Sequence, residues 1–242
     1  MDKIFVTTFN KRLYDEYANR LLKTYESTNQ KIPLYVFVED DTKQYPKFNN
    51  IHFLDLFEHE PDLKKFIDRN KNIKVESFFK DAVRFSYKVF AQNAARKYGD
   101  KIFFIDADCV FDKPIPIDWF DEFLPNDTFV SFYDRPQQYT ETGFLAFNEN
   151  KLISKAFFNY YTNLYKEDKV FELDNWTDCH TFDYTRRYYK EDIHYKELSQ
   201  GDGRNGHIMA RDKFLNPFID HRKGLRKQKQ HSPEWSKNNE GR

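Results

Sequence analysis

Residues 101–112 read KIFFIDADCVFD, and this stretch decides the fold. The apolar run from Ile102 to Ile105 predicts a buried strand, because strands covered on both faces read as continuous apolar segments. Asp106 and Asp108 follow at spacing i, i+2, which in an extended backbone points both carboxylates the same way. Open α/β sheets usually bind their ligands at the carboxyl ends of strands, so a ligand site is expected here.

Two converging carboxylates repel each other unless a cation or a set of hydrogen-bond donors compensates them. Hard oxygen ligands suit Mg²⁺ or Mn²⁺, and both ions commonly bridge to phosphates. The structural alternative is an ordinary turn, since Asp is frequent after strands. The pair therefore predicts either a divalent metal site or a simple strand-to-loop turn.

The segments around this strand alternate between strand and helix patterns. Further strands are predicted over Ile4–Thr8, Pro33–Val38, Ile51–Leu54, Phe129–Tyr133 and Gly143–Phe147. Helices are predicted over Lys11–Ser27, Phe78–Tyr98, Leu152–Tyr165 and Asp183–Tyr189, while residues 57–75 leave a helix and an irregular insertion open. This order predicts an α/β fold with a mostly parallel central sheet flanked by helices.

The length of 242 residues fits a single domain, which we place at residues 1–227. Residues 228–242 lack apolar periodicity and are expected to form a flexible polar tail. The formal net charge is zero, which argues against a molecule that binds nucleic acid through its overall charge. Residues 222–229 nevertheless carry five basic side chains, so nucleic acid stays a possible but less favoured partner.

The two cysteines give no disulfide framework and favour a reducing compartment. The first residues do not resemble a signal peptide, and no apolar run reaches the roughly 20 residues that span a bilayer. A cytoplasmic protein is expected, with peripheral membrane contact through the basic end left open.

Two later motifs join the Asp106-Ala107-Asp108 segment. They are Glu141-Thr142-Gly143 and the spacing His221-x-x-Gly224-x-x-Lys227. In this order, over residues 3 to 227, the motifs resemble the GT-A glycosyltransferases, which use nucleotide-sugar donors. The last motif resembles that of the glycogenin and bacterial galactosyltransferase-like group, which retains anomeric configuration.

The resemblance implies a Mn²⁺ or Mg²⁺ ion held by Asp106, Asp108 and His221. It also implies a nucleotide-sugar donor, most simply a UDP-sugar, whose diphosphate meets Lys227. Gly224 would let the backbone pass near phosphate, and Ala107 would lie against the donor.

Arg84 and Lys88 lie one turn apart on the predicted helix and would neutralise phosphate; the alternative is a solvated helix face. The resemblance puts the nucleoside at the ends of the first two strands. The expected contacts there are Thr7, Thr8, Asn10, Tyr14 and Glu39.

Asp178 resembles the acidic residue that GT-A enzymes place near the reacting sugar carbon. It would act as a nucleophile, as a base or by holding acceptor hydroxyls; the structural alternative is a loop Asp that caps a helix. The expected substrate-binding residues are Glu141, Thr142, Gly143, Trp176 and Asp178.

The leading hypothesis is therefore a metal-dependent glycosyltransferase acting on a hydroxyl acceptor, either a glycan, a lipid-linked sugar or a modified DNA base. A nucleotidyltransferase is a competing class, but it would normally carry a Gly-rich phosphate loop, and residues 7–11 have none. A non-catalytic nucleotide-binding protein is the third class.

Overall fold

The computed structural model describes residues 1–135, 138–199, 208–212, 214–224 and 227. The expected polar tail at 228–242 lies outside the described residues. Within the described part, no helix combines the length and the apolar character needed to cross a bilayer.

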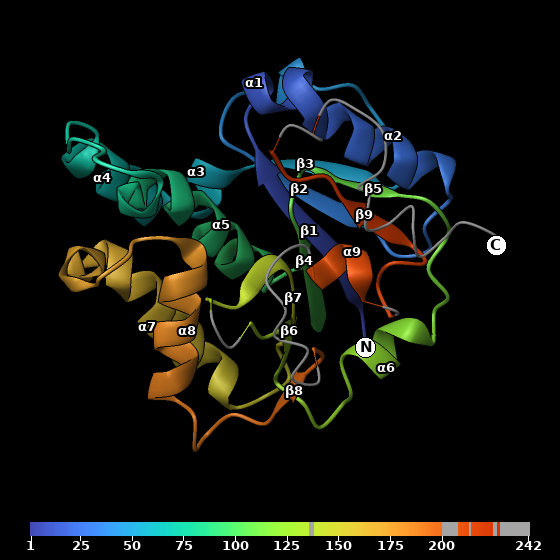
Figure 1. Ribbon diagram of the computed structural model, residues 1–242. Coiled ribbons are helices and arrows are strands. Elements are labelled where there is room, and N and C mark those ends of the chain that lie inside the picture. The colour runs from blue at the N-terminus through green and yellow to red at the C-terminus, as the bar shows by residue number, and fades with distance from the viewer. Residues whose placement is uncertain (136–137, 200–207, 213, 225–226, 228–242) are drawn as a thin grey trace.

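The centre of the molecule is a seven-stranded sheet with the strand order β3-β2-β1-β4-β7-β6-β8 (Figure 1). The first four strands in this order run parallel, β7 is antiparallel to both neighbours, and β8 pairs parallel with β6. The strands are β1 Lys3–Phe9, β2 Leu34–Val38, β3 Ile51–Asp55, β4 Lys101–Ile105, β6 Val130–Tyr133, β7 Glu141–Asn148 and β8 Tyr195–Glu197. The expected α/β fold with a mostly parallel sheet is confirmed.

A second, two-stranded sheet joins distant parts of the chain. Its strands are β5, Cys109–Phe111, and β9, Ile219–His221, which pair antiparallel. All six of their residues are buried. This small sheet positions two of the predicted metal ligands, because β5 follows directly on Asp108 and β9 ends at His221.

Helices cover both faces of the large sheet, which separates two apolar cores. One core packs side chains of α2, α6 and α9 against the sheet, and the other packs those of α3, α4, α5, α7 and α8. The helices are α1 Lys11–Leu13, α2 Asn19–Ser27, α3 Leu56–His59, α4 Pro61–Asn70, α5 Ala82–Ala95, α6 Trp119–Phe123, α7 Ile153–Lys166, α8 Asp178–Tyr188 and α9 Ile208–Arg211. A π-helical turn at Tyr14–Ala18 joins α1 to α2.

Two helix starts differ from the sequence prediction, and capping explains both. The predicted helix from Phe78 breaks into a 3₁₀ turn, Phe78–Lys80, followed by α5, because the Asp81 side chain accepts a hydrogen bond from the N–H of Arg84. Helix α8 begins five residues before the predicted Asp183, because Thr177 caps it by accepting from the N–H of His180. The open segment 57–75 forms most of α3 and all of α4.

Candidate metal and nucleotide site

Four carboxylates meet one histidine where β4 leaves the sheet. We call this set the carboxylate cluster; it consists of Asp106, Asp108, Glu141, Asp178 and His221. The N–H of Asp106 donates to the Gly143 carbonyl of β7 at 2.9 Å, and the N–H of Cys109 donates back to the Asp106 carbonyl at 3.1 Å. Asp106 to Asp108 is thus a turn, so the inference from an extended backbone is wrong, although both carboxylates still reach one site.

The β5–β9 pair brings His221 to this turn. Cys109 and His221 are register partners, and the N–H of Arg222 donates to the Asp108 carbonyl at 3.1 Å. Nε2 of His221 lies 3.1 Å from Oδ1 of Asp108 and 3.6 Å from Oδ2 of Asp106. Both His221 Nε2 and Asp108 Oδ1 are buried and form no well-oriented hydrogen bond with any described residue.

Unpartnered buried polar atoms are costly, and an ion bound between them would remove that cost. One ligand atom each from Asp108, Cys109 and His221 lies within 4.8 Å of the others, a spacing that can hold a metal. Burial raises the pKa of the Cys109 thiol far above its usual range, with the surrounding carboxylates adding to the effect. Apart from this thiol, Asp106, Asp108 and His221 offer oxygen and nitrogen donors, a set that suits Mn²⁺ or Mg²⁺.

Two lysines compensate the negative charge of three of these carboxylates. Nζ of Lys88 lies 2.8 Å from Oδ1 of Asp106 and 2.5 Å from Oδ2 of Asp178, and Nζ of Lys227 lies 3.0 Å from Oδ2 of Asp108. Burial opposes ionisation of Asp108, but the nearby His221 and Lys227 outweigh it and hold its pKa well below the usual range. Burial raises the pKa of Asp106, with Lys88 acting against the shift.

The negative charge of Glu141, which is close to His221, is compensated by two cations. Its Oε2 pairs with Nζ of Lys223 at 2.5 Å and with Nη1 of Arg135 at 3.2 Å, and its Oε1 accepts from the N–H of Gly143 at 3.0 Å. Burial alone would raise the pKa of Glu141, but the charges of Lys223, His221 and Arg135 lower it. Glu141 is therefore an ionised, internally paired group.

Gly143 is the residue of β7 that lies against His221. A Cβ at this position would lie 2.6 Å from Cε1 of His221, closer than real Cβ contacts come. The neighbouring Thr142 hydroxyl donates to Oδ2 of Asp178 at 2.5 Å. Strand β7 therefore supplies Gly143, which leaves room for the His221 ring, and Thr142, which orients the Asp178 carboxylate.

The residues expected at the nucleoside gather at the ends of β1 and β2; we call them the polar strand ends. The Thr8 hydroxyl donates to the Phe37 carbonyl at 2.7 Å, and the Asn10 amide donates to Glu39 at 3.0 Å. Burial raises the pKa of Glu39 to about 7, with Asn10 acting against the shift. Tyr14 lies edge-on to Tyr45 at 5.3 Å between ring centroids, and the Thr7 hydroxyl is buried without a described partner.

Two expected site residues lie outside both groups. The guanidinium of Arg84 is placed over the Phe78 ring at 5.3 Å, while Lys88, one turn later, enters the carboxylate cluster. Trp176 packs edge-on against Phe171. Ala107 is buried inside the turn, and Gly224 adopts a φ of +62°, a left-handed conformation that glycine takes without strain.

Sequence reasoning missed four residues at the carboxylate cluster. Tyr17 lies under the Lys227 ammonium at 4.3 Å, which its spacing of three from Tyr14 on a predicted helix could have suggested. Lys223 lies inside the quoted His221 motif, so its nearness to the site was a readable signal. Cys109 directly follows Asp108, so its nearness to the site was also readable, although its pairing with His221 was not. Arg135 gave no signal, because its contact with Glu141 depends on how the chain folds between β6 and β7.

No protein-family model and no curated protein sequence matches the chain. Solved structures do match. Mouse xyloside xylosyltransferase 1 superposes with a TM-score of 0.53 at 13% identity, over 82% of this chain and 85% of that one. An active-site mutant of LgtC gives a TM-score of 0.54 at 13% identity, over 91% and 87%.

GlyE of Streptococcus pneumoniae TIGR4 gives a TM-score of 0.52 at 15% identity over 81% of this chain, which spans about half of GlyE, 46%. The chain has a GT-A glycosyltransferase fold. Identity this low establishes the fold alone, so the roles of individual residues rest on their geometry.

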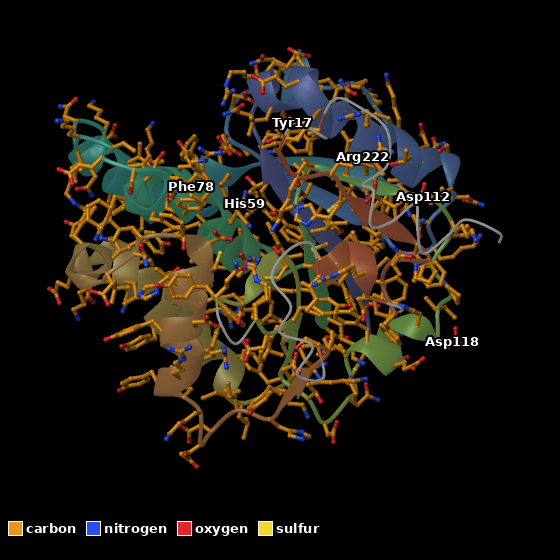
Figure 2. All side chains as sticks on the ribbon, in the orientation of Figure 1. Tyr17, His59, Phe78, Asp112, Asp118 and Arg222 are labelled. Carbon is orange, nitrogen blue, oxygen red and sulfur yellow. The ribbon has the colours of Figure 1, made fainter. Side chains whose placement is uncertain are left out.

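In this GT-A fold, both groups of residues face one edge of the sheet. Strands β2, β1 and β4 are parallel neighbours, so their carboxyl ends lie side by side. Figure 2 shows Tyr17 and Arg222, the one from the turn after β1 and the other next to His221, on the same side of the molecule. The arrangement places a candidate cation site next to the polar strand ends.

Proposed function

We propose that the chain is a metal-dependent glycosyltransferase that moves a sugar from a nucleotide-sugar donor, a UDP-sugar, to a hydroxyl acceptor. One observation carries the proposal: Asp108 Oδ1 and His221 Nε2 lie 3.1 Å apart beside Asp106 in a GT-A fold, both buried and neither with a well-oriented hydrogen bond to a described residue. The transferase domain would cover residues 1–227. A cytoplasmic location is part of the proposal and agrees with two free cysteines, Cys109 and Cys179.

Asp106, Asp108 and His221 would hold Mn²⁺ or Mg²⁺. The ion would supply positive charge where the diphosphate leaving group gains negative charge. Lys227 pairs with Asp108 and lies beside the proposed ion. A bound diphosphate can therefore replace the Asp108 carboxylate as the partner of the Lys227 ammonium. Gly224 leaves open space in which the backbone can approach phosphate.

The nucleoside would lie along the polar strand ends, with Ala107 at the join to the metal site. Asn10 and Glu39 offer an amide and a carboxyl group for hydrogen bonds. Tyr14 offers a ring for stacking on the base. Thr7 contributes a hydroxyl that has no described partner, and Thr8 fixes the strand spacing.

Asp178 would be the catalytic carboxylate. Its Oδ2 is oriented by Lys88 and Thr142, so the group is held fixed rather than free to rotate. A fixed carboxylate stabilises positive charge that develops at the sugar carbon as its bond to phosphate breaks. The acceptor hydroxyl, near Glu141, Gly143 and Trp176, would bond to that carbon as the sugar–phosphate bond breaks, and its proton would pass to an oxygen of the departing diphosphate. The His221 to Lys227 motif supports retention of configuration.

The test is thermal unfolding with a panel of nucleotide sugars, with and without Mn²⁺, on the wild type and Asp108→Ala. The expected result is a rise in Tm that needs both metal and one donor and disappears in the variant, because only a ligand bound to the native state stabilises it. Asp112→Asn is the matched control, since Asp112 follows β5 and lies away from Tyr17 in Figure 2.

A rise in Tm with nucleoside triphosphates alone would favour a nucleotidyltransferase. No rise with any donor would favour a non-catalytic protein. For a donor that does bind, the anomeric configuration of the product, read by NMR, tests retention.

A further inference from the structure

An exposed apolar segment lies between α4 and α5. We give this name to residues 71–80, in which Ile73, Val75, Phe78 and Phe79 have exposed fractions of 40%, 53%, 56% and 52%. These are four of the ten exposed large hydrophobic residues among those described, although the segment is only ten residues long. Apolar side chains gathered in this way mark an interaction surface rather than ordinary surface scatter.

The segment also covers an apolar cavity of about 200 Å³. Ile73 and Val75 line it from the segment, Val83 from α5, and Phe171 and Trp176 from the chain before α8. Exposed side chains therefore continue into an apolar recess, which gives an inserted hydrocarbon group somewhere to pack.

Basic side chains surround the apolar ones. Lys71, Lys74, Lys80 and Arg84 stand beside three acids, Asp68, Glu76 and Asp81. Asp68 Oδ1 lies 3.9 Å from Lys71 Nζ, and Asp81 is used by its cap on α5. The Arg84 guanidinium rests on the Phe78 ring at 5.3 Å, and Lys80 Nζ rests on the Trp176 ring at 4.6 Å. Apolar rings carrying cations at their edges fit an interface between hydrocarbon and anionic headgroups.

We propose that the exposed apolar segment docks on an anionic lipid surface, with Ile73, Val75, Phe78 and Phe79 inserted and the surrounding lysines at the headgroups. This is peripheral contact through a loop and requires no spanning helix. Figure 2 shows Phe78 on the α4–α5 side of the molecule, away from Asp118 and α6.

Docking here would set the proposed active site beside the bilayer. The N–H of Trp176 donates to the Phe79 carbonyl at 2.8 Å, and Trp176 is two residues before Asp178. On α5, Arg84 is one turn before Lys88, which contacts Asp106 and Asp178. An acceptor attached to a lipid would thus meet the site without leaving the membrane; this last step rests on the proposed function, whereas the docking does not.

The experiment is co-sedimentation of the full chain with phosphatidylcholine vesicles that contain or lack phosphatidylglycerol. We expect binding to the anionic vesicles that weakens at high salt, because the lysine contacts are screened. Phe78→Ser with Phe79→Ser should lower the partition coefficient about tenfold or more, since both rings leave the interface. Lys71→Gln with Lys74→Gln should lower it about tenfold, as each lysine contributes by attraction to the anionic surface.

Matched controls remove the same groups elsewhere. Leu152→Ser with Ile117→Ser deletes two exposed apolar side chains, and Lys43→Gln with Lys47→Gln deletes two exposed lysines; neither pair should change binding. Unchanged binding in the Phe78 and Phe79 variant, with Tm near that of the wild type, would overturn the proposal. So would a dimer in sedimentation velocity that the same variant abolishes, because a second copy would then cover the segment. Donor-dependent stabilisation, measured without vesicles, tests the transferase function separately.

Discussion

The polar strand ends and the carboxylate cluster lie on the same edge of the sheet but satisfy their polar groups differently. At the ends of β1 and β2, neutral donors meet fixed partners, as in Thr8 with Phe37 and Asn10 with Glu39. In the carboxylate cluster, charge balances charge, and Lys88 alone holds two carboxylates. The hydrogen bonds of the first group are already made without a ligand. In the second group, lysines occupy the positions next to the carboxylates at which a metal and a diphosphate would act.

In the proposed function, this difference would separate donor recognition from reaction. Neutral hydrogen bonds are short-ranged and select shape, so they suit a nucleoside. Paired charges in a poorly solvated site interact strongly and respond to any added ion. Variants of the cluster should therefore change the response to metal, and variants of the strand ends should change the affinity for the donor without changing the response to metal.

The largest expected effect is at Lys88. Lys88→Met leaves Asp106 and Asp178 without their shared cation and should lower the free energy of unfolding by about 3 kcal/mol in metal-free buffer, the scale of breaking a buried pair. Mn²⁺ should restore more stability to the variant than it adds to the wild type, because the ion replaces the missing charge at Asp106. Denaturant titrations with and without Mn²⁺ measure both quantities.

Arg84→Met is the control for Lys88, since it removes a cation one turn earlier on α5 that rests on an exposed ring. It should leave the Mn²⁺ response unchanged. Equal Mn²⁺ responses in the wild type and Lys88→Met would mean that Lys88 and the metal do not share Asp106.

A smaller effect is expected at Gly143. Gly143→Ala forces a Cβ toward His221 and should cost about 2 kcal/mol through overpacking, while weakening Mn²⁺ binding because the imidazole must move. Gly99→Ala is matched, since its Cβ would meet Ile4 side-chain atoms at 3.0 Å, far along the chain from the cluster. Gly99→Ala should lower stability without changing the affinity for Mn²⁺. Calorimetric titration with Mn²⁺ measures that affinity, and an equal loss in both variants would contradict this account.

The smallest effect is a pH dependence at Glu39. Burial raises its pKa to about 7 from an unfolded value of 4.5, so its stabilising contribution is complete below pH 4.5 and is lost as pH rises through 7. Glu39→Gln should therefore gain about 1 kcal/mol over the wild type between pH 5 and pH 8, less than the full shift in pKa would give because the residue is only half-buried. Thermal unfolding at the two pH values measures the gain.

Glu60 is the matched group away from the strand ends. Burial also raises its pKa to about 7, and it accepts from Asn93 as Glu39 accepts from Asn10. Glu60→Gln should show the same pH-dependent gain in stability, but only Glu39→Gln should also change the pH dependence of donor affinity. A change in donor affinity with both variants would remove Glu39 from the proposed nucleoside site.

Local pattern predicted much of the fold from sequence. The strand over Ile102–Ile105 and the helix over Lys11–Ser27 follow from apolar runs and periodicity within a few residues, which any local reading can detect. The boundaries of α5 and α8 were missed because single caps, Asp81 and Thr177, decide them. A cap is one hydrogen bond, so it leaves almost no trace in a periodic pattern.

The candidate site also contains residues that the sequence could predict and contacts that it could not. Asp106, Asp108, His221 and Lys227 lie close together, as the family resemblance implied, and their roles stay predictions. The Lys88 bridge between Asp106 and Asp178 could not be predicted, because it depends on how α5 and α8 pack on the sheet. Pairing across distant segments is a property of topology rather than of local sequence.

The β5–β9 pair makes assembly of the metal site a late event in folding. Asp108 is in place once β4 and its following turn form, but His221 arrives only when the last described strand pairs with Cys109–Phe111. Contacts between residues so distant in sequence form slowly, since a long loop must close first. A chain emerging from the ribosome would therefore expose an incomplete ligand set until His221 has been synthesised and β9 has paired with β5, and metal capture would report on that pairing.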